Sequence, residues 1–347
     1  MQVEIGYTYD DVLLIPKYSE VESRDNVDLS VQLPKGIKLD IPLISANMSH
    51  VTGPVLATEI AKVGGMAILH RFDDVDTLEN NYFHAVEQLS QYCSNGAVGV
   101  SVGVKEKDLN LLERVIDPEP YKRSLACKVV CVDVAHGHHK LAGEFVNKVS
   151  RLYPEVLLIA GNVCTPEGAR YLYEAGADVI KIGIGPSGVC TTRIETGNGY
   201  PQLSALDNIC NTSYVRRGMY DPVFIADGGI TNSGNISKAL TFADLVMIGG
   251  LFAGTDESPG NIISIDGKKY KQYAGSSTHK KKHVEGVSGL VPYRGSLADV
   301  VDGLLQGVRS CCSYQGVSNL NNLKIDPRFV SISNSGLKES LPHDIRL

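Results

Sequence analysis

The chain has 347 residues, of which 43% are hydrophobic and 21% are charged, with a formal net charge of −6. This composition is typical of a soluble globular protein and excludes a disordered, collagen-like or coiled-coil chain. Because the charge is acidic, no run approaches 18 apolar residues and the first residues lack a secretory signal pattern, we expect a cytoplasmic protein that binds neither nucleic acid nor a membrane.

Short apolar runs, each followed by a segment with helical periodicity, recur eight times along the chain. They lie at residues 41–46, 66–70, 97–102, 129–134, 156–160, 179–184, 223–226 and 245–248. Because they are continuous rather than alternating, we expect a parallel sheet with helices on both faces. Between them lie helix start signals, such as Thr165 as an N-cap followed by Pro166. Eight such units predict an α/β fold with a single (β/α)8 TIM barrel over residues 1–347. A doubly wound open sheet is the alternative, because the periodicity of apolar residues does not show whether the sheet closes into a barrel.

The loop that follows the sixth predicted strand contains a candidate nucleophile. Its sequence, GIGPSGVCTTR at 183–193, places Cys190 after a run of glycines and close to Arg193. Glycines allow backbone N–H groups to turn toward an anion, and a nearby cation lowers the pKa of a thiol. The alternative is a buried free cysteine in a tight turn. Its place after a barrel strand favours a catalytic role.

Glycine pairs follow the seventh and eighth predicted strands. Gly228 and Gly229 come after Asp227, and Gly249 and Gly250 end the last strand. In TIM barrels these two loops often form a phosphate site, with the aspartate free to hold a sugar hydroxyl. The alternative is that the glycines only form tight turns.

These motifs, together with YDDVLL at 9–14, EGVSG at 285–289 and SGLKES at 335–340, resemble the IMP dehydrogenase/GMP reductase family. The resemblance extends from about residue 7 to the end of the chain. It implies that Cys190 attacks C2 of a purine nucleotide, that Thr192 relays a proton and that Glu285 sets this relay. It also implies that the nucleotide contacts Met48, Ser187, Gly188, Asp227, Gly228, Gly229, Gly249, Gly250, Tyr273 and Ser276, with Asp227 on the ribose and the later glycines and Tyr273 on the 5′-phosphate.

The same resemblance implies a nicotinamide cofactor and a homotetramer. The cofactor would contact Asp133, Asn162, Gly183 and Gly185. As in the dehydrogenases of the family, backbone carbonyls of Gly183, Gly185 and Cys190 would hold a monovalent cation such as K⁺.

Two branches of the family differ in their reaction, and most of the distinguishing segments favour the reductase. Only residues 73–95 separate the second and third strands, where dehydrogenases usually carry a regulatory insertion. Dehydrogenases also use an Arg-Tyr pair on a mobile flap, which we place at about 262–292, but residues 273–285 contain no arginine. The sequence TGNGYPQLS at 196–204 is similar to the reductase pattern, whereas the tail at 336–345 is closer to the dehydrogenases. We therefore expect an NADPH-dependent GMP reductase. The alternatives are an IMP dehydrogenase without the regulatory domains and a catalytically silent purine-nucleotide sensor.

Overall fold

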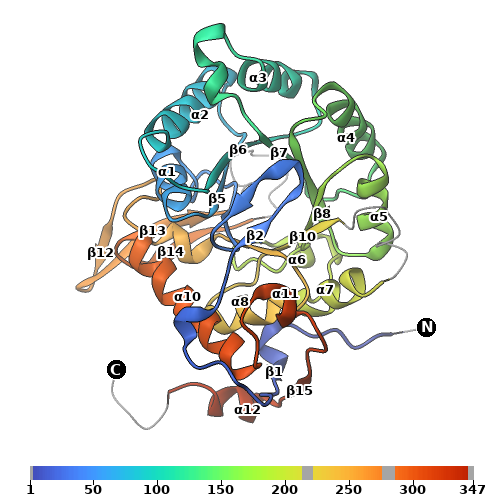
Figure 1. Ribbon diagram of the computed structural model, residues 1–347, viewed down its shortest axis with the longest axis vertical. Helices are drawn as coiled ribbons and strands as arrows, with labels where there is room; N and C mark the ends of the chain where they lie inside the picture. Colours follow the sequence, from blue (N-terminus) through green and yellow to red (C-terminus); the bar gives the residue numbers. More distant parts are fainter. Residues whose placement is uncertain (1–2, 213–221, 276–285, 343–347) are drawn as a thin grey trace.

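A closed barrel of eight parallel strands forms the centre of the computed structural model, which describes residues 3–212, 222–275 and 286–342 (Figure 1). The strands are β4 (Leu43–Ser45), β5 (Met66–Leu69), β6 (Ala97–Val102), β7 (Val129–Asp133), β8 (Leu157–Val163), β9 (Val179–Ile182), β10 (Val223–Asp227) and β11 (Leu245–Ile248). They follow one another around the barrel in chain order, and β11 pairs with β4 to close it. All eight predicted strands and the TIM barrel are confirmed, and the open sheet is wrong.

Helices connect successive strands and cover the outside of the barrel (Figure 1). They are α1 (Pro54–Lys62), α2 (Val75–Leu89), α3 (Glu106–Ile116), α4 (Lys140–Leu152), α5 (Pro166–Glu174), α7 (Gln202–Cys210), α8 (Ser233–Leu240) and α10 (Leu297–Tyr314). As predicted, Thr165 caps α5: its hydroxyl accepts a hydrogen bond from the N–H of Gly168, and Pro166 begins the helix. Apolar residues on the inner faces of these helices join those of the strands in one hydrophobic core. The core gives the strand ends a rigid support.

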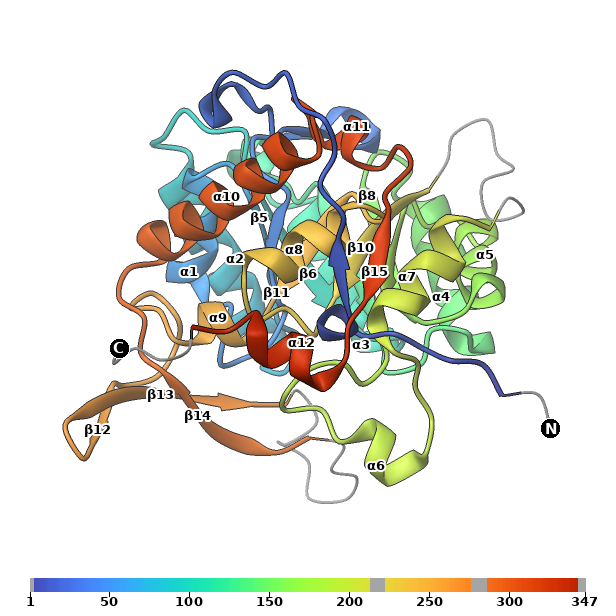
Figure 2. The same ribbon diagram turned by 90° about the horizontal axis from the view of Figure 1, so that it is seen from below.

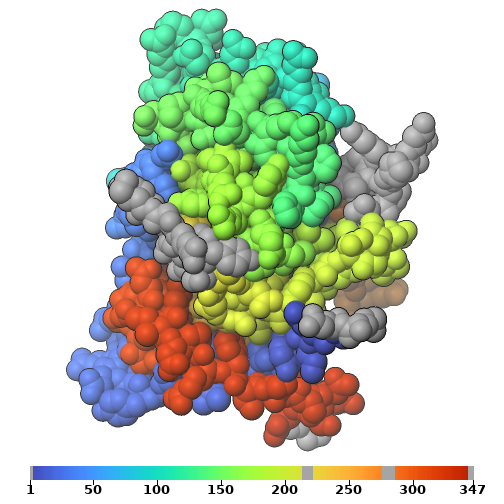
Figure 3. Space-filling view, turned by 90° about the vertical axis from the view of Figure 1, so that its right-hand side faces the viewer, coloured from blue at the N-terminus to red at the C-terminus, as the bar shows by residue number. Residues whose placement is uncertain are grey.

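The first and last parts of the chain lie together beside the barrel (Figure 3). Strand β1 (Val12–Leu14) pairs antiparallel with β15 (Phe329–Ser331). The shorter helices are η1 (Tyr9–Asp11), η2 (Arg24–Asn26), η3 (Pro34–Gly36), η4 (Pro120–Leu125), α6 (Thr192–Thr196), α9 (Gly250–Ala253), α11 (Leu320–Leu323) and α12 (Asn334–Glu339). None of the helices in the described ranges combines the length and the apolar character needed to cross a membrane.

A separate antiparallel sheet lies at the end of the barrel that also carries α6 (Figure 2). It consists of β12 (Ile263–Ile265), β13 (Lys268–Ala274) and β14 (Ser288–Pro292), within the segment predicted as a flap. A hairpin of β2 (Val31–Gln32) and β3 (Lys38–Leu39) lies at the opposite end. Ser276 and Glu285, two of the predicted site residues, lie outside the described residues.

Candidate active site

Two adjoining cavities lie at the carboxyl ends of the barrel strands. The first has a volume of about 380 Å³ and the second about 630 Å³. They share a wall made of Pro186, Ser187, Val189, Gly228 and Met247. The two cavities are therefore neighbours at one end of the barrel. This is the end of a TIM barrel at which active sites are found.

The candidate nucleophile lines the first cavity. Cys190 is half-buried, and its Sγ donates a hydrogen bond to Oγ1 of Thr192 over 3.2 Å. The backbone turns here, since the N–H of Cys190 donates to the carbonyl of Ser187, and α6 begins at Thr192. A thiol and a hydroxyl in contact at a cavity wall can attack an electrophilic carbon and transfer a proton. The structure therefore brings together the predicted Cys190 and Thr192.

The loop around Cys190 is held by glycine geometry and by an arginine. At Gly183, where φ is +146°, a Cβ atom would come within 2.1 Å of the carbonyl oxygen of Asp227, so only glycine fits. The guanidinium of Arg193 donates to the carbonyls of Ile184 and Tyr200. Arg193, predicted as a cation for the thiol, thus holds the loop by hydrogen bonds to its backbone.

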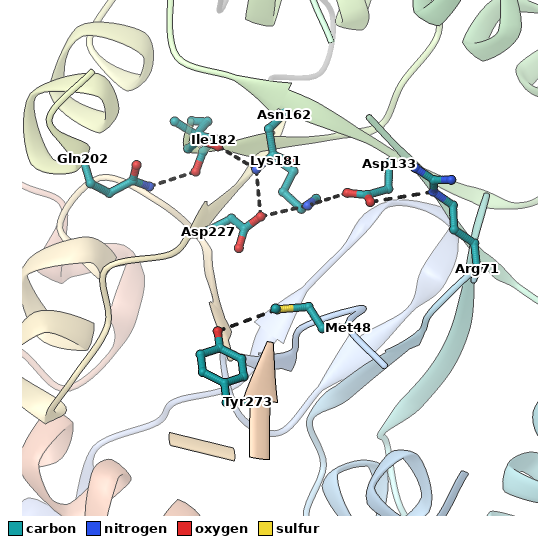
Figure 4. A network of polar contacts seen from close by, with 10 residues as sticks. Met48, Arg71, Asp133, Asn162, Lys181, Ile182, Gln202, Asp227 and Tyr273 are labelled. Carbon is teal, nitrogen blue, oxygen red and sulfur yellow. Dashed lines mark hydrogen bonds and ion pairs between the residues drawn. The ribbon is translucent and has the colours of Figure 1, made fainter. Parts of the chain in front are cut away.

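A buried ammonium joins two predicted site residues (Figure 4). Nζ of Lys181 lies 2.9 Å from Oδ1 of Asp133 and 2.8 Å from Oδ2 of Asp227. On the far side of Asp133, Nε of Arg71 lies 3.9 Å from Oδ2. The amide of Asn162 donates to Oδ2 of Asp227 over 2.8 Å. These side chains come from the ends of β5, β7, β8, β9 and β10, and all of them line the first cavity.

The charges in this network stabilise one another. Burial disfavours the ammonium of Lys181, but Asp133 and Asp227 outweigh burial and raise its pKa. Burial also disfavours the charge of Asp133, but Lys181, Arg71 and a hydrogen bond from Asn47 hold its pKa below the usual range. Asp133 and Lys181 are therefore both charged at neutral pH, and each depends on the other.

The second cavity is lined by the residues predicted to bind the 5′-phosphate, which are Gly228, Gly229, Gly249, Gly250 and Tyr273. Ser187 and Gly188, predicted to bind the nucleotide, line it as well. Positive φ angles of +95° at Gly228 and +79° at Gly229 shape the turn after β10, a conformation that favours glycine. Successive backbone N–H groups in such turns form a concave site for an anion. The structure thus groups these seven residues around one cavity.

Tyr273 closes this cavity from strand β13. Its hydroxyl lies 3.4 Å from Oγ of Ser187. It also lies 3.7 Å from Sδ of Met48 (Figure 4). A Cβ atom on Gly249 would lie only 2.6 Å from this hydroxyl, so the glycine permits the close approach. Burial raises the pKa of Tyr273, so the hydroxyl keeps its proton and can donate it to an anion.

Several residues of the site were given no role from the sequence. Lys181 lies inside an apolar run and was not identified, whereas Arg71 is one of the polar residues noted at the predicted strand ends. Thr8, Tyr9 and Asp10 line the second cavity, although YDDVLL predicted only the family. A lone lysine within an otherwise apolar barrel strand is the signal that could have identified Lys181, since a buried lysine requires acidic partners.

One acceptor in the first cavity has no partner within the structure. Oδ1 of Asn162 is buried without a hydrogen bond, while Nδ2 of the same side chain also donates to the carbonyl of Gly183 over 2.7 Å. A buried acceptor at a cavity wall fits an N–H donor from a ligand. Within the described residues, no group of three His, Cys, Asp or Glu side chains is placed to bind a metal ion. The cation site at the carbonyls of Gly183, Gly185 and Cys190 stays a prediction.

Comparison with known proteins adds to this geometry. Residues 6–343 match the family described as IMP dehydrogenase / GMP reductase domain. The GMP reductase of Staphylococcus epidermidis strain RP62A is 38% identical over 326 residues, which cover 92% of this chain and 94% of that protein. The GMP reductase of Staphylococcus carnosus is 38% identical over 338 residues, with 95% and 97% covered. The inosine-5′-monophosphate dehydrogenase of Borreliella burgdorferi is 35% identical over 402 residues, with 97% and 96% covered.

Proposed function

Because the chain belongs to the IMP dehydrogenase / GMP reductase family of oxidoreductases, we propose that it is an NADPH-dependent GMP reductase. This enzyme converts GMP to IMP and ammonia. The observation that carries the proposal is the contact of 3.2 Å between the Cys190 thiol and the Thr192 hydroxyl at the wall of the first cavity. This pair supplies a nucleophile and a proton relay, and it requires no arginine to activate water.

The reaction begins when the thiolate of Cys190 adds to C2 of GMP. Thr192 delivers a proton to the 2-amino group, a relay that the family resemblance assigns to Glu285 to set, and ammonia leaves as the C–N bond breaks. The purine is then held as a covalent thioimidate on Cys190. When bound, NADPH supplies the hydride that reduces C2. The C–S bond breaks afterwards, IMP departs and Cys190 returns to its thiolate.

The residues of the first cavity fit a nicotinamide. The unpartnered Oδ1 of Asn162 is an acceptor for a carboxamide N–H, and Asp133 is a charged acceptor in the same cavity. Asp227 would hold the ribose of GMP, while the glycine turns and Tyr273 would hold its phosphate in the second cavity. The shared wall between the cavities would then lie along the nucleotide, between its sugar and its phosphate.

The organisation of the chain supports the reductase over the dehydrogenase. Between β5 and β6 the structure has one helix, α2, and no inserted domain. The alignment with the S. epidermidis reductase spans 326 residues, whereas the alignment with the B. burgdorferi dehydrogenase spans 402, more than the 347 of this chain. The dehydrogenase alignment therefore contains gaps in this chain. We further propose a cytoplasmic homotetramer, which light scattering of the purified protein would check.

The test is the absorbance of reduced nicotinamide with the purified protein. We expect GMP plus NADPH to lose this absorbance and to release ammonia, and we expect no turnover from the Cys190→Ala variant, which should still bind nucleotide. Gain of absorbance with IMP plus NAD would instead identify an IMP dehydrogenase. Silence in both assays, with nucleotide still bound, would identify a sensor. Turnover by Cys190→Ala would refute the covalent step.

A further inference from the structure

The ammonium of Lys181 lies in the candidate site but takes part in no step of the proposed reaction. It lies within β9, its side chain is 3% exposed, and it contacts a carboxylate on either side. We propose that Lys181 is a positioning residue: it fixes the Asp227 carboxylate so that one oxygen faces both hydroxyls of a ribose, and the site thereby selects ribonucleotides over 2′-deoxyribonucleotides. This inference rests on the proposed function, because it assigns the sugar of the nucleotide to Asp227.

The hydrogen bonds to the Asp227 carboxylate involve only one of its two oxygens within the described residues. Within the described part of the chain, both hydrogen bonds that its side chain accepts end on Oδ2, one from Lys181 and one from Asn162, each over 2.8 Å. Oδ1 keeps its two lone pairs, and the side chain, 20% exposed, lines the first cavity. Two lone pairs on one oxygen match the two donors of a vicinal diol.

Lys181 holds this orientation more firmly than Asn162 can. Nδ2 of Asn162 is neutral and also donates to the carbonyl of Gly183. The ammonium carries a full charge in a buried place, where solvent screens the attraction little. Asp133 holds the ammonium from the other side over 2.9 Å, so Lys181 cannot turn away from Asp227 without losing a second ion pair.

The barrel provides the space for this lysine at a glycine. Gly161 on β8 pairs with Lys181 on β9 and with Asp133 on β7. A Cβ atom on Gly161 would lie 2.6 Å from Cβ of Lys181. Since real side chains do not approach so closely, the missing side chain on β8 is what allows Lys181 to lie between Asp133 and Asp227.

The predicted consequence is a measurable preference. A 2′-deoxyribonucleotide lacks one of the two donors and leaves a lone pair of Oδ1 without its partner from the ligand. The loss of one hydrogen bond to a charged group corresponds to about a 10- to 150-fold weaker affinity. If Lys181 is removed, the carboxylate of Asp227 can rotate about its side-chain bonds. The ratio of the dissociation constants of the 2′-deoxyribonucleotide and the ribonucleotide should then fall to about one.

The experiment measures the dissociation constants of GMP and 2′-deoxy-GMP without cofactor, so that it does not depend on turnover. We compare the unmodified protein with Lys181→Met and Lys181→Arg. We expect a ratio of about tenfold or more in the unmodified protein, a ratio near one in Lys181→Met and a partly restored ratio in Lys181→Arg. A purely structural lysine would weaken both ligands equally and leave the ratio unchanged.

A double variant guards against the possibility that Lys181→Met alone fails to fold. Lys181→Met leaves two carboxylates without their cation, whereas Lys181→Met combined with Asp133→Asn removes one of these charges, and the ratio should be near one there as well. An unmodified protein with a ratio near one, or a Lys181→Met variant that keeps the full ratio, would overturn this inference alone. Failure of the unmodified protein to bind GMP and IMP would overturn the proposed function and this inference together.

Discussion

Removing the hydroxyl of Tyr273 should weaken phosphate binding and leave the fold intact. This hydroxyl lies on the wall of the second cavity, beside the turn at Gly249. A hydrogen bond to a charged group contributes about 1.5–3 kcal/mol, so Tyr273→Phe should raise the dissociation constant of GMP by about 10- to 150-fold. Its contact of 3.4 Å with Ser187 is longer than an ordinary O–H···O bond, and the thioether sulfur of Met48, at 3.7 Å, is a weak acceptor. Their loss should therefore cost the fold less than about 1 kcal/mol.

The assay compares GMP with guanosine, which lacks the phosphate, by titration calorimetry. GMP should lose affinity in Tyr273→Phe while guanosine binds as it does to the unmodified protein, and Tm should fall by no more than about 4 °C. Tyr270→Phe is the matched control, because Tyr270 lies on the same strand but does not line either cavity. An equal loss for GMP and guanosine would refute the assignment of this cavity to the phosphate.

Two further substitutions test the electrostatics of the fold. The ammonium of Lys271 is buried and donates to the carbonyls of Thr255 (2.8 Å) and Ser258 (2.6 Å). Lys271→Met should leave these acceptors unpaired and lower the free energy of unfolding, measured in urea, by about 2–5 kcal/mol. An unchanged urea midpoint would contradict this expectation. The pKa of Asp133 is lowered in the folded state, so its contribution to stability is fully present above the ordinary value of about 4 and is lost as pH falls through the lower folded value. The difference in unfolding free energy between the unmodified protein and Asp133→Asn should therefore be constant from about pH 5 to 8 and shrink at more acidic pH; a difference that stays constant down to about pH 3 would show that the carboxylate is not held by charge.

The strands of the barrel could be predicted because each is a local apolar run, but their ends and their partners could not. The apolar pattern predicted 156–160 for the fifth strand, whereas β8 extends to Val163. Gly161 and Asn162 break the apolar run, yet pairing with β7 continues at Asp133 and Gly161. Strand β1 pairs with β15 more than 300 residues later, and three residues on each side carry no pattern that identifies the partner.

The site was predictable where its residues form contiguous motifs. The loop at 183–193 and the two glycine pairs are local, and the cavities contain them as a group. Lys181 was not predictable in the same way, because its partners lie 48 and 46 residues away in the sequence. The strand order β7-β8-β9-β10 in the sheet brings Asp133 and Asp227 to opposite sides of one ammonium. The surroundings of this buried lysine thus depend on which strands are neighbours, which the local sequence does not show.

This network is placed where function, rather than stability, requires it. The interior of a TIM barrel is normally packed with branched apolar side chains, and buried ion pairs replaced by apolar groups of similar volume often leave a protein equally or more stable. Removing one partner alone is different, because it leaves an unpaired buried charge at a cost of about 3–5 kcal/mol. The Lys181→Met variant should therefore be less stable than the double variant Lys181→Met, Asp133→Asn, although both lose the ion pair between Lys181 and Asp227. Comparing these two variants separates stability from the proposed sugar selectivity. The free energy of unfolding depends on the balance of buried charge, whereas the proposed selectivity depends on the orientation of the Asp227 carboxylate.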